Sequence, residues 1–368
     1  MSEEIKNVQE ELNDQMQIRR DKLAEYEADG IYPFGQRFVV KDHAKDIKDD
    51  FLNYEDQPTV IAGRLMTMRS HGKTAFANIR DLTGDIQVYF RKDVLGEDNY
   101  KYVKMLDIGD IVGIEGHVFR THSGEVTIKV NKLTLLSKAL RPLPEKWHGL
   151  KDTELRYRQR YVDLIVNPEV RDTFIKRSKI VAKIREYMMN DGFMEVETPM
   201  MHPIPGGAAA RPFITHHNAL DIDIYMRIAP ELYLKRLIVG GMERVFEMNR
   251  CFRNEGIDNR HNPEFTTIES YQAYGDVEDA IRLTENLVSY CAQEVLGTQE
   301  ITYQGTEINL TPPWNRITMA EGVKKYTGED FDAVTTVEEA RAIADRLNVE
   351  YTDNDGIGKI LNACFEDY

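Results

Sequence analysis

The chain has 368 residues, and 47 Lys and Arg against 62 Asp and Glu give it a formal net charge of −15 at pH 7. Its 42% hydrophobic and 30% charged residues are typical of a globular protein of two or three domains and exclude collagen, a disulfide scaffold and a wholly disordered chain. Three scattered cysteines, a polar N-terminus and the absence of any apolar run near the ~20 residues of a membrane helix predict a soluble cytoplasmic protein with no membrane partner.

The first predicted element is a charged helix over residues 3–29, which ends at Gly30 and Pro33. It contains a basic cluster at 17–22, which we interpret as a solvated helix face rather than a phosphate contact, because most charge runs are solvated. Residues 1–58 are therefore expected to form a helical N-terminal extension.

Five runs rich in Val, Ile, Thr, Tyr and Phe follow, separated by turn signals, and predict strands. These strands cover residues 59–68, 74–80, 85–91, 111–120 and 125–136. A helix is predicted between the third and fourth strands, over 97–106. Five strands with a helix after the third are typical of a small closed barrel of the oligonucleotide-binding (OB) type, although other five-stranded barrels would look similar.

A proline-bearing connector at 141–145 predicts a domain boundary. The larger region beyond it mixes helical and strand patterns, and is expected to be an α+β domain. Its predicted helices are 168–191, 232–238 and 275–296, and its predicted strands are 193–199, 245–248, 251–252 and 266–271. The predicted domains are the extension 1–58, the barrel 59–140, the linker 141–165 and the α+β domain 166–368.

The stretch 250–271 carries most of the candidate chemistry. Two antiparallel strands with a polar loop at their tip would hold Arg253, Glu255, His261 and Phe265 around one cavity. Arginine clamps phosphate or carboxylate, histidine can add positive charge, phenylalanine offers a flat face to a base, and glutamate can accept from an exocyclic amine. This set describes a nucleoside triphosphate site without a P-loop, while a charged surface hairpin is the alternative that spacing alone leaves open.

The same stretch resembles motif 2 of class II aminoacyl-tRNA synthetases, and residues 192–199 resemble motif 1, whose helix and strand form the dimer interface in that class. A barrel followed by this catalytic half is similar to the lysyl, aspartyl and asparaginyl subgroup, in which an N-terminal OB fold binds the anticodon. The resemblance is closest to the lysyl-tRNA synthetases, through residues 206–213 (GGAAARPF), 227–235 (RIAPELYLK) and 260–266 (RHNPEFT). It covers nearly the whole chain, removes the charged-hairpin alternative and implies an antiparallel-sheet catalytic domain.

The resemblance further implies a lysine–tRNA ligase, which uses ATP to activate L-lysine and transfers it to tRNA(Lys). Arg253 would be the catalytic residue, holding the α-phosphate of ATP and the lysine carboxylate. The implied ATP-binding residues are Arg253, Glu255, His261, Asn262 and Phe265. The implied lysine-binding residues are Gly207, Glu231, Arg253, Glu269 and Tyr271. The implied anticodon-binding residues are Phe76, Gln87 and Glu125. Considered alone, Phe76 would be a core residue, and Glu231 and Glu269 would be surface carboxylates.

The family's third motif, a glycine-rich segment whose final arginine sandwiches the adenine, is not found; residues 355–359 are the nearest candidate and lack the pattern. The chain stops at Tyr368, before the family's acidic magnesium ligands, so we expect a fragment of an ATP- and Mg²⁺-dependent homodimer with no metal ligand of its own. Such a chain alone would activate lysine weakly or not at all. Two alternatives are aspartyl or asparaginyl specificity, which Glu269 and Tyr271 oppose, and a truncated tRNA-binding module without catalysis.

Overall fold

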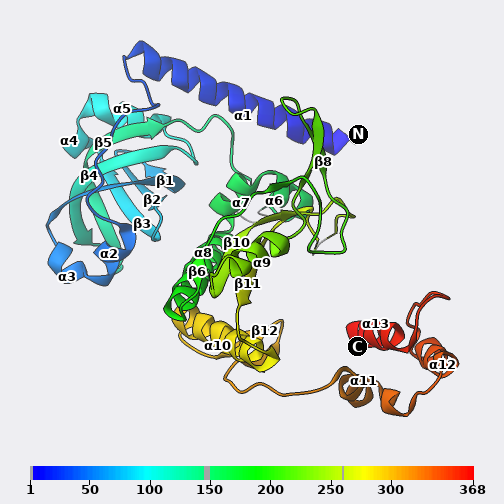
Figure 1. Ribbon diagram of the computed structural model, residues 1–368. Coiled ribbons are helices and arrows are strands. Elements are labelled where there is room, and N and C mark those ends of the chain that lie inside the picture. Colours follow the sequence, from blue (N-terminus) through cyan, green and yellow to red (C-terminus); the bar gives the residue numbers. More distant parts are fainter. Residues whose placement is uncertain (1–2, 145–149, 259–260) are drawn as a thin grey trace. The chain divides into compact units, whose positions relative to one another are not determined.

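The structure is a computed structural model that describes residues 3–144, 150–258 and 261–368 (Figure 1). It divides into two compact units, Met1–Arg171 and Asp172–Tyr368. Across the described ranges, no helix combines the length and the hydropathy that crossing a membrane requires.

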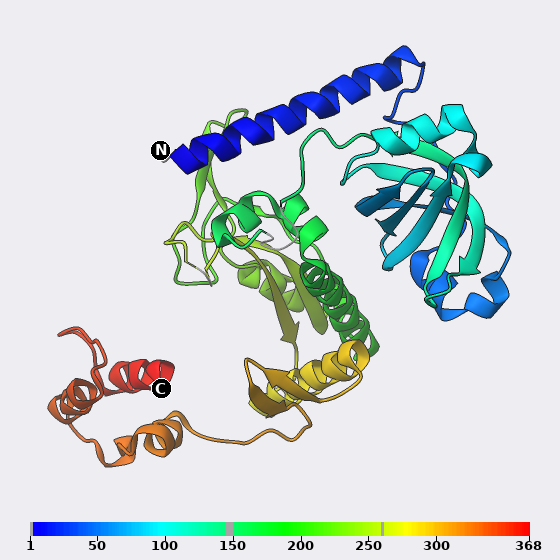
Figure 2. The same cartoon turned by 180° about the vertical axis from the view of Figure 1, so that it is seen from behind.

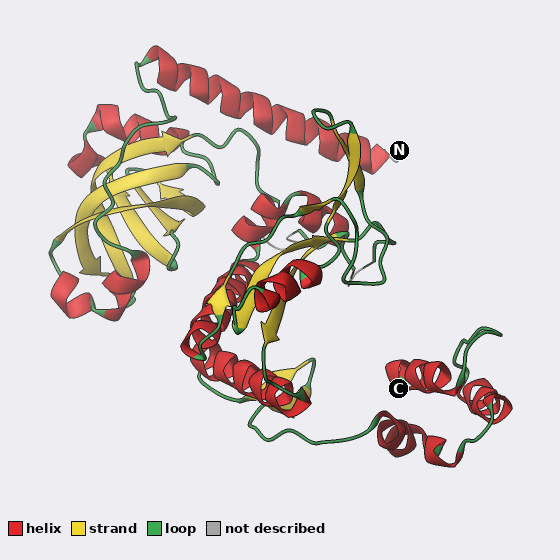
Figure 3. Cartoon of the chain, viewed as in Figure 1, coloured by secondary structure: helices red, strands yellow, loops and turns green. Residues whose placement is uncertain are grey.

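The first unit is built on a closed five-stranded barrel, drawn as yellow arrows in Figure 3. Its strands are β1 (Pro58–His71), β2 (Thr74–Arg80), β3 (Asp85–Arg91), β4 (Ile111–Arg120) and β5 (Val126–Ser137). They follow the order β1-β2-β3-β5-β4, with β3 and β5 parallel and the other pairs antiparallel. Burial alternates residue by residue along β2 and β3, because successive side chains of a strand point to opposite faces. The OB-type barrel predicted from the sequence is thus confirmed.

Helices accompany this barrel in the first unit. They are α1 (Glu3–Ala28), α2 (Ala44–Asp49), α3 (Phe51–Tyr54), α4 (Lys92–Leu95), α5 (Glu97–Met105), α6 (Thr153–Arg158) and α7 (Arg160–Val166). The helix predicted after the third strand is α5, preceded by the four-residue α4. Gly96 separates the two at φ +80°, a conformation that favours glycine.

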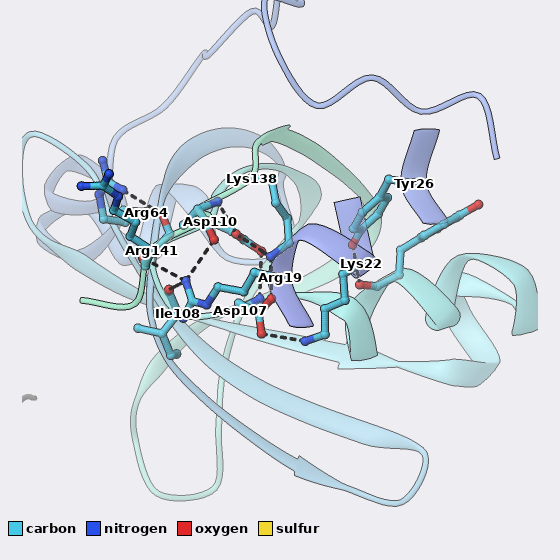
Figure 4. A network of polar contacts seen from close by, with 12 residues as sticks. Arg19, Lys22, Tyr26, Arg64, Asp107, Ile108, Asp110, Lys138 and Arg141 are labelled. Carbon is cyan, nitrogen blue, oxygen red and sulfur yellow. Dashed lines mark hydrogen bonds and ion pairs between the residues drawn. The ribbon is translucent and has the colours of Figure 1, made fainter. Parts of the chain in front are cut away.

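Helix α1 contacts the barrel through polar side chains, which corrects the prediction that its basic cluster is solvated (Figure 4). Arg19 is buried and donates to the carbonyls of Ile108, Ala139 and Arg141 at 3.0–3.1 Å. Lys22 Nζ lies 2.6 Å from Asp107 Oδ1. Sequence pattern missed these contacts because their acceptors are loop carbonyls and a carboxylate about a hundred residues away.

The same network contains a buried ion pair beneath α1 (Figure 4). Lys138 Nζ is fully buried, 2.6 Å from Asp107 Oδ2 and 3.0 Å from Asp110 Oδ1. Burial raises the pKa of the Asp110 carboxyl despite the neighbouring ammonium group. Burial acts on Asp107 in the same direction, but hydrogen bonds from Lys138 and Lys22 outweigh it and lower the pKa of that carboxyl.

The second unit contains a three-stranded sheet in the order β11-β10-β6. Its strands are β6 (Met194–Glu195), β10 (Arg244–Phe252) and β11 (Glu264–Gln272). Helices α8 (Pro168–Asn190) and α10 (Val277–Leu296) supply Met188, Leu283 and Leu287 to an apolar cluster with Phe246 of the sheet. Figures 1 and 2 show both helices beside these strands. Strands β10 and β11 are antiparallel and β6 adds to them in parallel, so the predicted α+β domain built on an antiparallel pair is confirmed.

Two strand predictions in this unit need correction. The strand predicted over 193–199 is only the two-residue β6, which pairs in parallel with Val245 and Phe246. The two strands predicted at 245–248 and 251–252 are one strand, β10, because Asn249 and Arg250 continue the pairing with β11. Polar side chains interrupt the apolar pattern there without interrupting the backbone ladder.

The remaining elements of the second unit lie around and after this sheet. A small sheet comprises β7 (Met201–His202), β8 (Ile214–His217) and β9 (Ile222–Met226), and α9 (Glu231–Val239) packs against β10 and β11. The later elements are the hairpin strands β12 (Glu300–Tyr303) and β13 (Thr306–Asn309), the helices α11 (Met319–Thr327), α12 (Val337–Leu347) and α13 (Ile357–Asp367), and the 3₁₀ turn η1 (Phe331–Ala333). Helices α11–α13 share an apolar core of their own.

Candidate active site and nucleic-acid interface

The hairpin β10–β11 positions the candidate ATP-binding residues. Its register pairs Cys251 with Phe265. The amide of Arg253 donates to the carbonyl of Pro263 at 2.8 Å, so the two segments of the hairpin stay hydrogen-bonded past the end of β10. The Arg253 guanidinium carbon lies 5.1 Å from the centre of the Phe265 ring. A cation and a flat aromatic face therefore stand side by side at the tip of the hairpin.

A cavity of about 220 Å³ opens at this tip. Its lining residues include all five residues implied to bind ATP: Arg253, Glu255, His261, Asn262 and Phe265. Small-molecule sites are usually roughly 300–1,000 Å³ in volume. The described residues thus form a cavity that suits part of a nucleotide rather than a whole one.

Local hydrogen bonds hold the polar groups of this cavity. Glu255 Oε1 accepts from the amide of Arg211 at 3.2 Å, and the Arg211 carbonyl accepts from the amide of Asn254 at 2.7 Å. His261 donates its amide to Asp258 Oδ1 at 2.7 Å, and its Nδ1 lies 2.7 Å from Oδ2 of the same carboxylate. Arg260, part of the segment behind the resemblance, lies outside the described residues.

The Arg253 side chain has a buried nitrogen, Nε, without a hydrogen-bond partner among the described residues. Among the described residues, only three buried side-chain nitrogen or oxygen atoms have no hydrogen-bond partner: Arg253 Nε, Arg227 Nη2 and Arg341 Nε. Buried polar groups in native proteins are nearly always paired, so an unpaired one calls for an explanation. An anion bound in the adjoining cavity would provide the missing acceptor for Arg253.

Three acidic groups gather beside this hairpin. Glu269 and Tyr271 lie two residues apart on β11, hence on one face, and the Tyr271 hydroxyl donates to Glu269 Oε2 at 3.2 Å. Burial raises the pKa of Glu269; the Tyr271 hydrogen bond opposes that rise and the charge of Glu231, at the start of α9, adds to it. Burial and the same two carboxylates raise the pKa of Tyr271. The group has the charge to receive an ammonium ion.

Gly207 completes the set implied to bind lysine. It adopts φ +89°, and a Cβ at this position would lie 2.9 Å from Glu231 Cβ and 3.1 Å from Ala229 Cβ. Only glycine allows the backbone to run this close to the start of α9. The structure thus brings Gly207 against Glu231, and Glu231 into the electrostatic neighbourhood of Glu269 and Tyr271.

Sequence reasoning missed two cations beside this acidic group. Lys235 Nζ lies 2.6 Å from Glu231 Oε1 and 5.9 Å from the centre of the Tyr271 ring. The four-residue spacing between Glu231 and Lys235 was an available signal for this pair. Arg227 is buried against Glu247, and nothing in its local sequence pattern points to that partner.

Comparisons with known proteins agree with this arrangement. Residues 152–355 match the family described as tRNA synthetases class II (D, K and N), and residues 59–136 match the OB-fold nucleic acid binding domain. The chain belongs to the class II tRNA synthetases. The resemblance inferred from the sequence is thereby confirmed.

Several curated relatives of this synthetase are named lysine–tRNA ligase. That of Thermoanaerobacter pseudethanolicus is 56% identical over 367 residues, which cover 100% of this chain and 74% of the relative. That of Carboxydothermus hydrogenoformans is 57% identical over 358 residues, covering 97% of this chain and 73% of the relative. The Bacillus subtilis protein is 54% identical over 373 residues, covering 100% of this chain and 74% of the relative.

The barrel of the synthetase carries a second candidate site. Phe76 and Gln87 line one cavity of about 420 Å³, together with Arg69, His71 and Asn78. Glu125 is exposed before β5, with Oε1 3.4 Å from Lys48 Nζ, and is not among the residues that line this cavity. Two of the three residues implied to bind the anticodon thus line one cavity, and Thr127 Oγ1 links the third to it, 2.9 Å from Gln87 Oε1 and 3.2 Å from the Glu125 carbonyl.

Phe76 lies on the outside of the barrel and not in its core. Its neighbours Ala75 and Ala77 point inward and are buried, whereas the Phe76 ring stacks on Tyr89 with ring centres 4.4 Å apart and an interplanar angle of 19°. The centre of the Tyr89 ring in turn lies 6.2 Å from that of Phe119. Sequence reasoning missed these two aromatic residues, although each sits at an outward position of its strand.

Proposed function

We propose that this synthetase is a lysine–tRNA ligase: it activates L-lysine with ATP and transfers it to tRNA(Lys). The observation that carries the proposal is the acidic group that Glu231 of α9 forms with Glu269 and Tyr271 of β11, the strand of the hairpin that also carries Phe265 of the Arg253 cavity. An ammonium removed from water needs a carboxylate and further acceptors to offset its desolvation. The names and high identity of the relatives support the same conclusion.

The chemistry is a displacement at phosphorus followed by acyl transfer. The lysine carboxylate oxygen attacks the α-phosphorus of ATP, the bond to the β-phosphate oxygen breaks, and pyrophosphate leaves with that electron pair. A ribose hydroxyl at the 3′ end of the tRNA then attacks the adenylate carbonyl and AMP departs. The chain supplies positioning and charge rather than a nucleophile.

Each side chain has a role that its surroundings support. Arg253 bridges the α-phosphate and the lysine carboxylate, since its Nε is buried and has no partner among the described residues. Phe265 stacks on adenine, Glu255 accepts from the adenine amine, and Asn262 lines the nucleotide site. His261, held by Asp258, reaches the outer phosphates.

The protein contacts lysine at both its α-amino group and its side-chain ammonium. Glu231 and the Gly207 backbone receive the α-amino group, while Glu269 and Tyr271 receive the side-chain ammonium. Aspartate would place a third carboxylate among these acidic groups, and asparagine would leave them without a cation. Both alternative specificities are therefore disfavoured.

Magnesium is expected as the partner of ATP, and its chemistry is to neutralise phosphate charge. Within the described ranges, no group of three or more His, Cys, Asp or Glu side chains could hold a metal ion. The steps above therefore use only the chain's own groups.

We further propose that the synthetase is a cytoplasmic homodimer. The motif 1 elements α8 and β6 leave apolar side chains exposed at Phe174, Ile175, Ile180 and Met194, a surface that a second copy would cover.

The cysteines support the proposed cytoplasmic location. Cys251, Cys291 and Cys364 are all buried and free of disulfides, which suits a reducing compartment.

The proposed anticodon contact gives one testable prediction. Phe76→Ala should weaken binding of tRNA(Lys) by about 1–3 kcal/mol, or roughly 5- to 150-fold, because a base stacked on an aromatic ring contributes about that much. Fluorescence anisotropy with a labelled tRNA(Lys) transcript measures it. Leu82→Ala, an exposed apolar residue between β2 and β3, is the matched control and should bind normally. Equal binding by the Phe76 variant and the wild type would refute the contact.

Lysine-dependent ATP–pyrophosphate exchange tests the proposed reaction. The protein expressed from its complete reading frame should catalyse exchange with L-lysine, and at least about a hundredfold more slowly with L-aspartate or L-asparagine, because an uncompensated buried carboxylate or an unpaired acidic group disfavours both. Exchange that is faster with L-aspartate or L-asparagine than with L-lysine would contradict the assignment to lysine.

The polypeptide restricted to residues 1–368 separates catalysis from binding. We expect it to bind L-lysine and tRNA(Lys) but to exchange poorly, because the cavity at Phe265 offers adenine one aromatic face within the described residues. If the protein from the complete reading frame binds tRNA and forms no adenylate, the second candidate function, an RNA-binding module without catalysis, takes its place. The match of residues 59–136 to a nucleic acid binding domain favours that candidate in such a case.

A further inference from the structure

Arg227 is the largest fully buried side chain in the described part of the chain, with 1% of its surface exposed. Its Nη1 lies 2.6 Å from Glu247 Oε1 and 3.2 Å from Thr198 Oγ1, and its Nε donates to the Arg250 carbonyl at 2.8 Å. Thr198 Oγ1 closes the ring by donating to Glu247 Oε2 at 2.6 Å. One guanidinium therefore joins the segment after β6 to strand β10.

The backbone of Arg227 makes the same connection. Its amide donates to the Met200 carbonyl at 2.8 Å, and its carbonyl accepts from the amide of Phe252 at 2.9 Å. Glu231 follows four residues later at the start of α9, and Arg253 follows Phe252 directly. The two residues proposed to grip the α-amino and carboxylate groups of lysine thus both extend from this junction.

We propose that Arg227 is a positioning residue that sets the separation of Glu231 and Arg253 and keeps the lysine site charged, without touching the substrate. The proposal rests on the proposed function and deepens it. Its Nη1 and Nε already bind Glu247, Thr198 and the Arg250 carbonyl, and its Nη2 is buried, so we assign to Arg227 an effect through its charge rather than a direct contact with lysine. The Arg227 side chain and backbone amide also tie this site to Thr198, within the motif 1 resemblance, and to Met200 directly after it.

The field of Arg227 acts on the carboxylate proposed to bind the lysine side chain. The charged and titratable groups around Glu269 include Tyr271 on its own strand, Glu231 of α9, Glu247 of β10, and Arg227. Lys235 of α9 lies beside the same group, with Nζ 2.6 Å from Glu231 Oε1. Burial raises the pKa of Glu269, Glu231 and Glu247 add to that rise, and Arg227 opposes it more than Glu247 promotes it. Arg227 therefore favours the ionised form of Glu269, which an ammonium ligand requires.

Lysine binding as a function of pH, measured by isothermal titration calorimetry, tests this role. The double variant Arg227→Met/Glu247→Met removes the buried pair while filling its volume, a replacement that proteins often tolerate. We expect it to bind lysine at least about tenfold more weakly, with unchanged affinity for ATP, and to lose lysine binding at a higher pH than the wild type. Arg236→Met, an exposed arginine of α9, is the matched control and should behave as wild type.

Two single variants separate the field from a general structural effect. Arg227→Lys keeps the charge but cannot make the three side-chain contacts, so affinity should fall while the pH of half-loss stays near that of the wild type. Glu247→Gln should move that pH downward, opposite to the double variant. Variants that fold and bind lysine with unchanged affinity and pH profile would overturn the proposal. Absence of lysine binding by the wild type would instead overturn the proposed function.

Discussion

Arg253→Ala should reduce lysine-dependent ATP–pyrophosphate exchange about 100- to 1,000-fold, the range observed when one charge-stabilising donor is removed from a transition state. Arg253 stands at the cavity with Phe265, and its Nε has no partner among the described residues. The alanine variant removes the cation that would meet charge developing at the α-phosphorus. Exchange assays of the protein from its complete reading frame measure the effect.

Arg250→Ala is the control for this result. Arg250 lies in β10, three residues before Arg253, is exposed, and its Nε is 3.4 Å from Glu264 Oε1. An exposed ion pair contributes little, so exchange should change less than about twofold. A comparable loss in both variants would show that the hairpin, and not the Arg253 charge, had been damaged.

Glu269→Gln should weaken lysine binding about 10- to 150-fold, since a hydrogen bond to a charged group contributes about 1.5–3 kcal/mol. Glutamine keeps the volume of the side chain and a hydrogen-bond acceptor for Tyr271 but not the charge. Equilibrium dialysis with labelled L-lysine measures the loss, and the exposed Glu264→Gln on the same strand should bind normally. Unchanged affinity in the Glu269 variant would remove it from the lysine site.

The pH dependence of the wild type follows from the same carboxylate. Burial raises the pKa of Glu269, so the neutral form persists to a higher pH than in an exposed glutamate. Neutral Glu269 cannot pair with an ammonium ion, and lysine affinity should therefore fall as the pH is lowered through that raised pKa. Glu269→Gln should lose this dependence, because it has no proton to gain.

Much of the fold followed from local pattern. Strands β2 and β3 have the bounds expected from the sequence, because each alternates inward and outward side chains over seven residues between clear turn signals. The predicted range 193–199 is longer than strand β6 because the partner strand, about fifty residues away in the sequence, determines where pairing stops. The basic cluster of α1 looks solvated from the sequence because its charges reach acceptors that no local pattern displays.

The candidate site followed from local pattern only where its residues share one hairpin. Arg253 and Phe265 meet because an antiparallel register places them together. Glu231 and Gly207 came from a family resemblance, since nothing in their own neighbourhood indicates that two loops approach. Neither local pattern nor the family resemblance indicated a role for Arg227, because its side-chain partners in β10 and after β6 come together only in the folded chain. The domain limits and the roles of the site residues stay predictions.

The polar contacts of α1 have a consequence for how this helix can move. An apolar helix face can slide or roll on its support, because many similar contacts replace those lost. Arg19 Nη1 instead donates to three carbonyls, one before β4 and two after β5, and Lys22 binds the carboxylate of Asp107 before β4. A roll by one residue, about 100°, would lose all of these bonds together. We therefore expect helix α1 to be either docked on the barrel in this one register or fully released, with few intermediate positions.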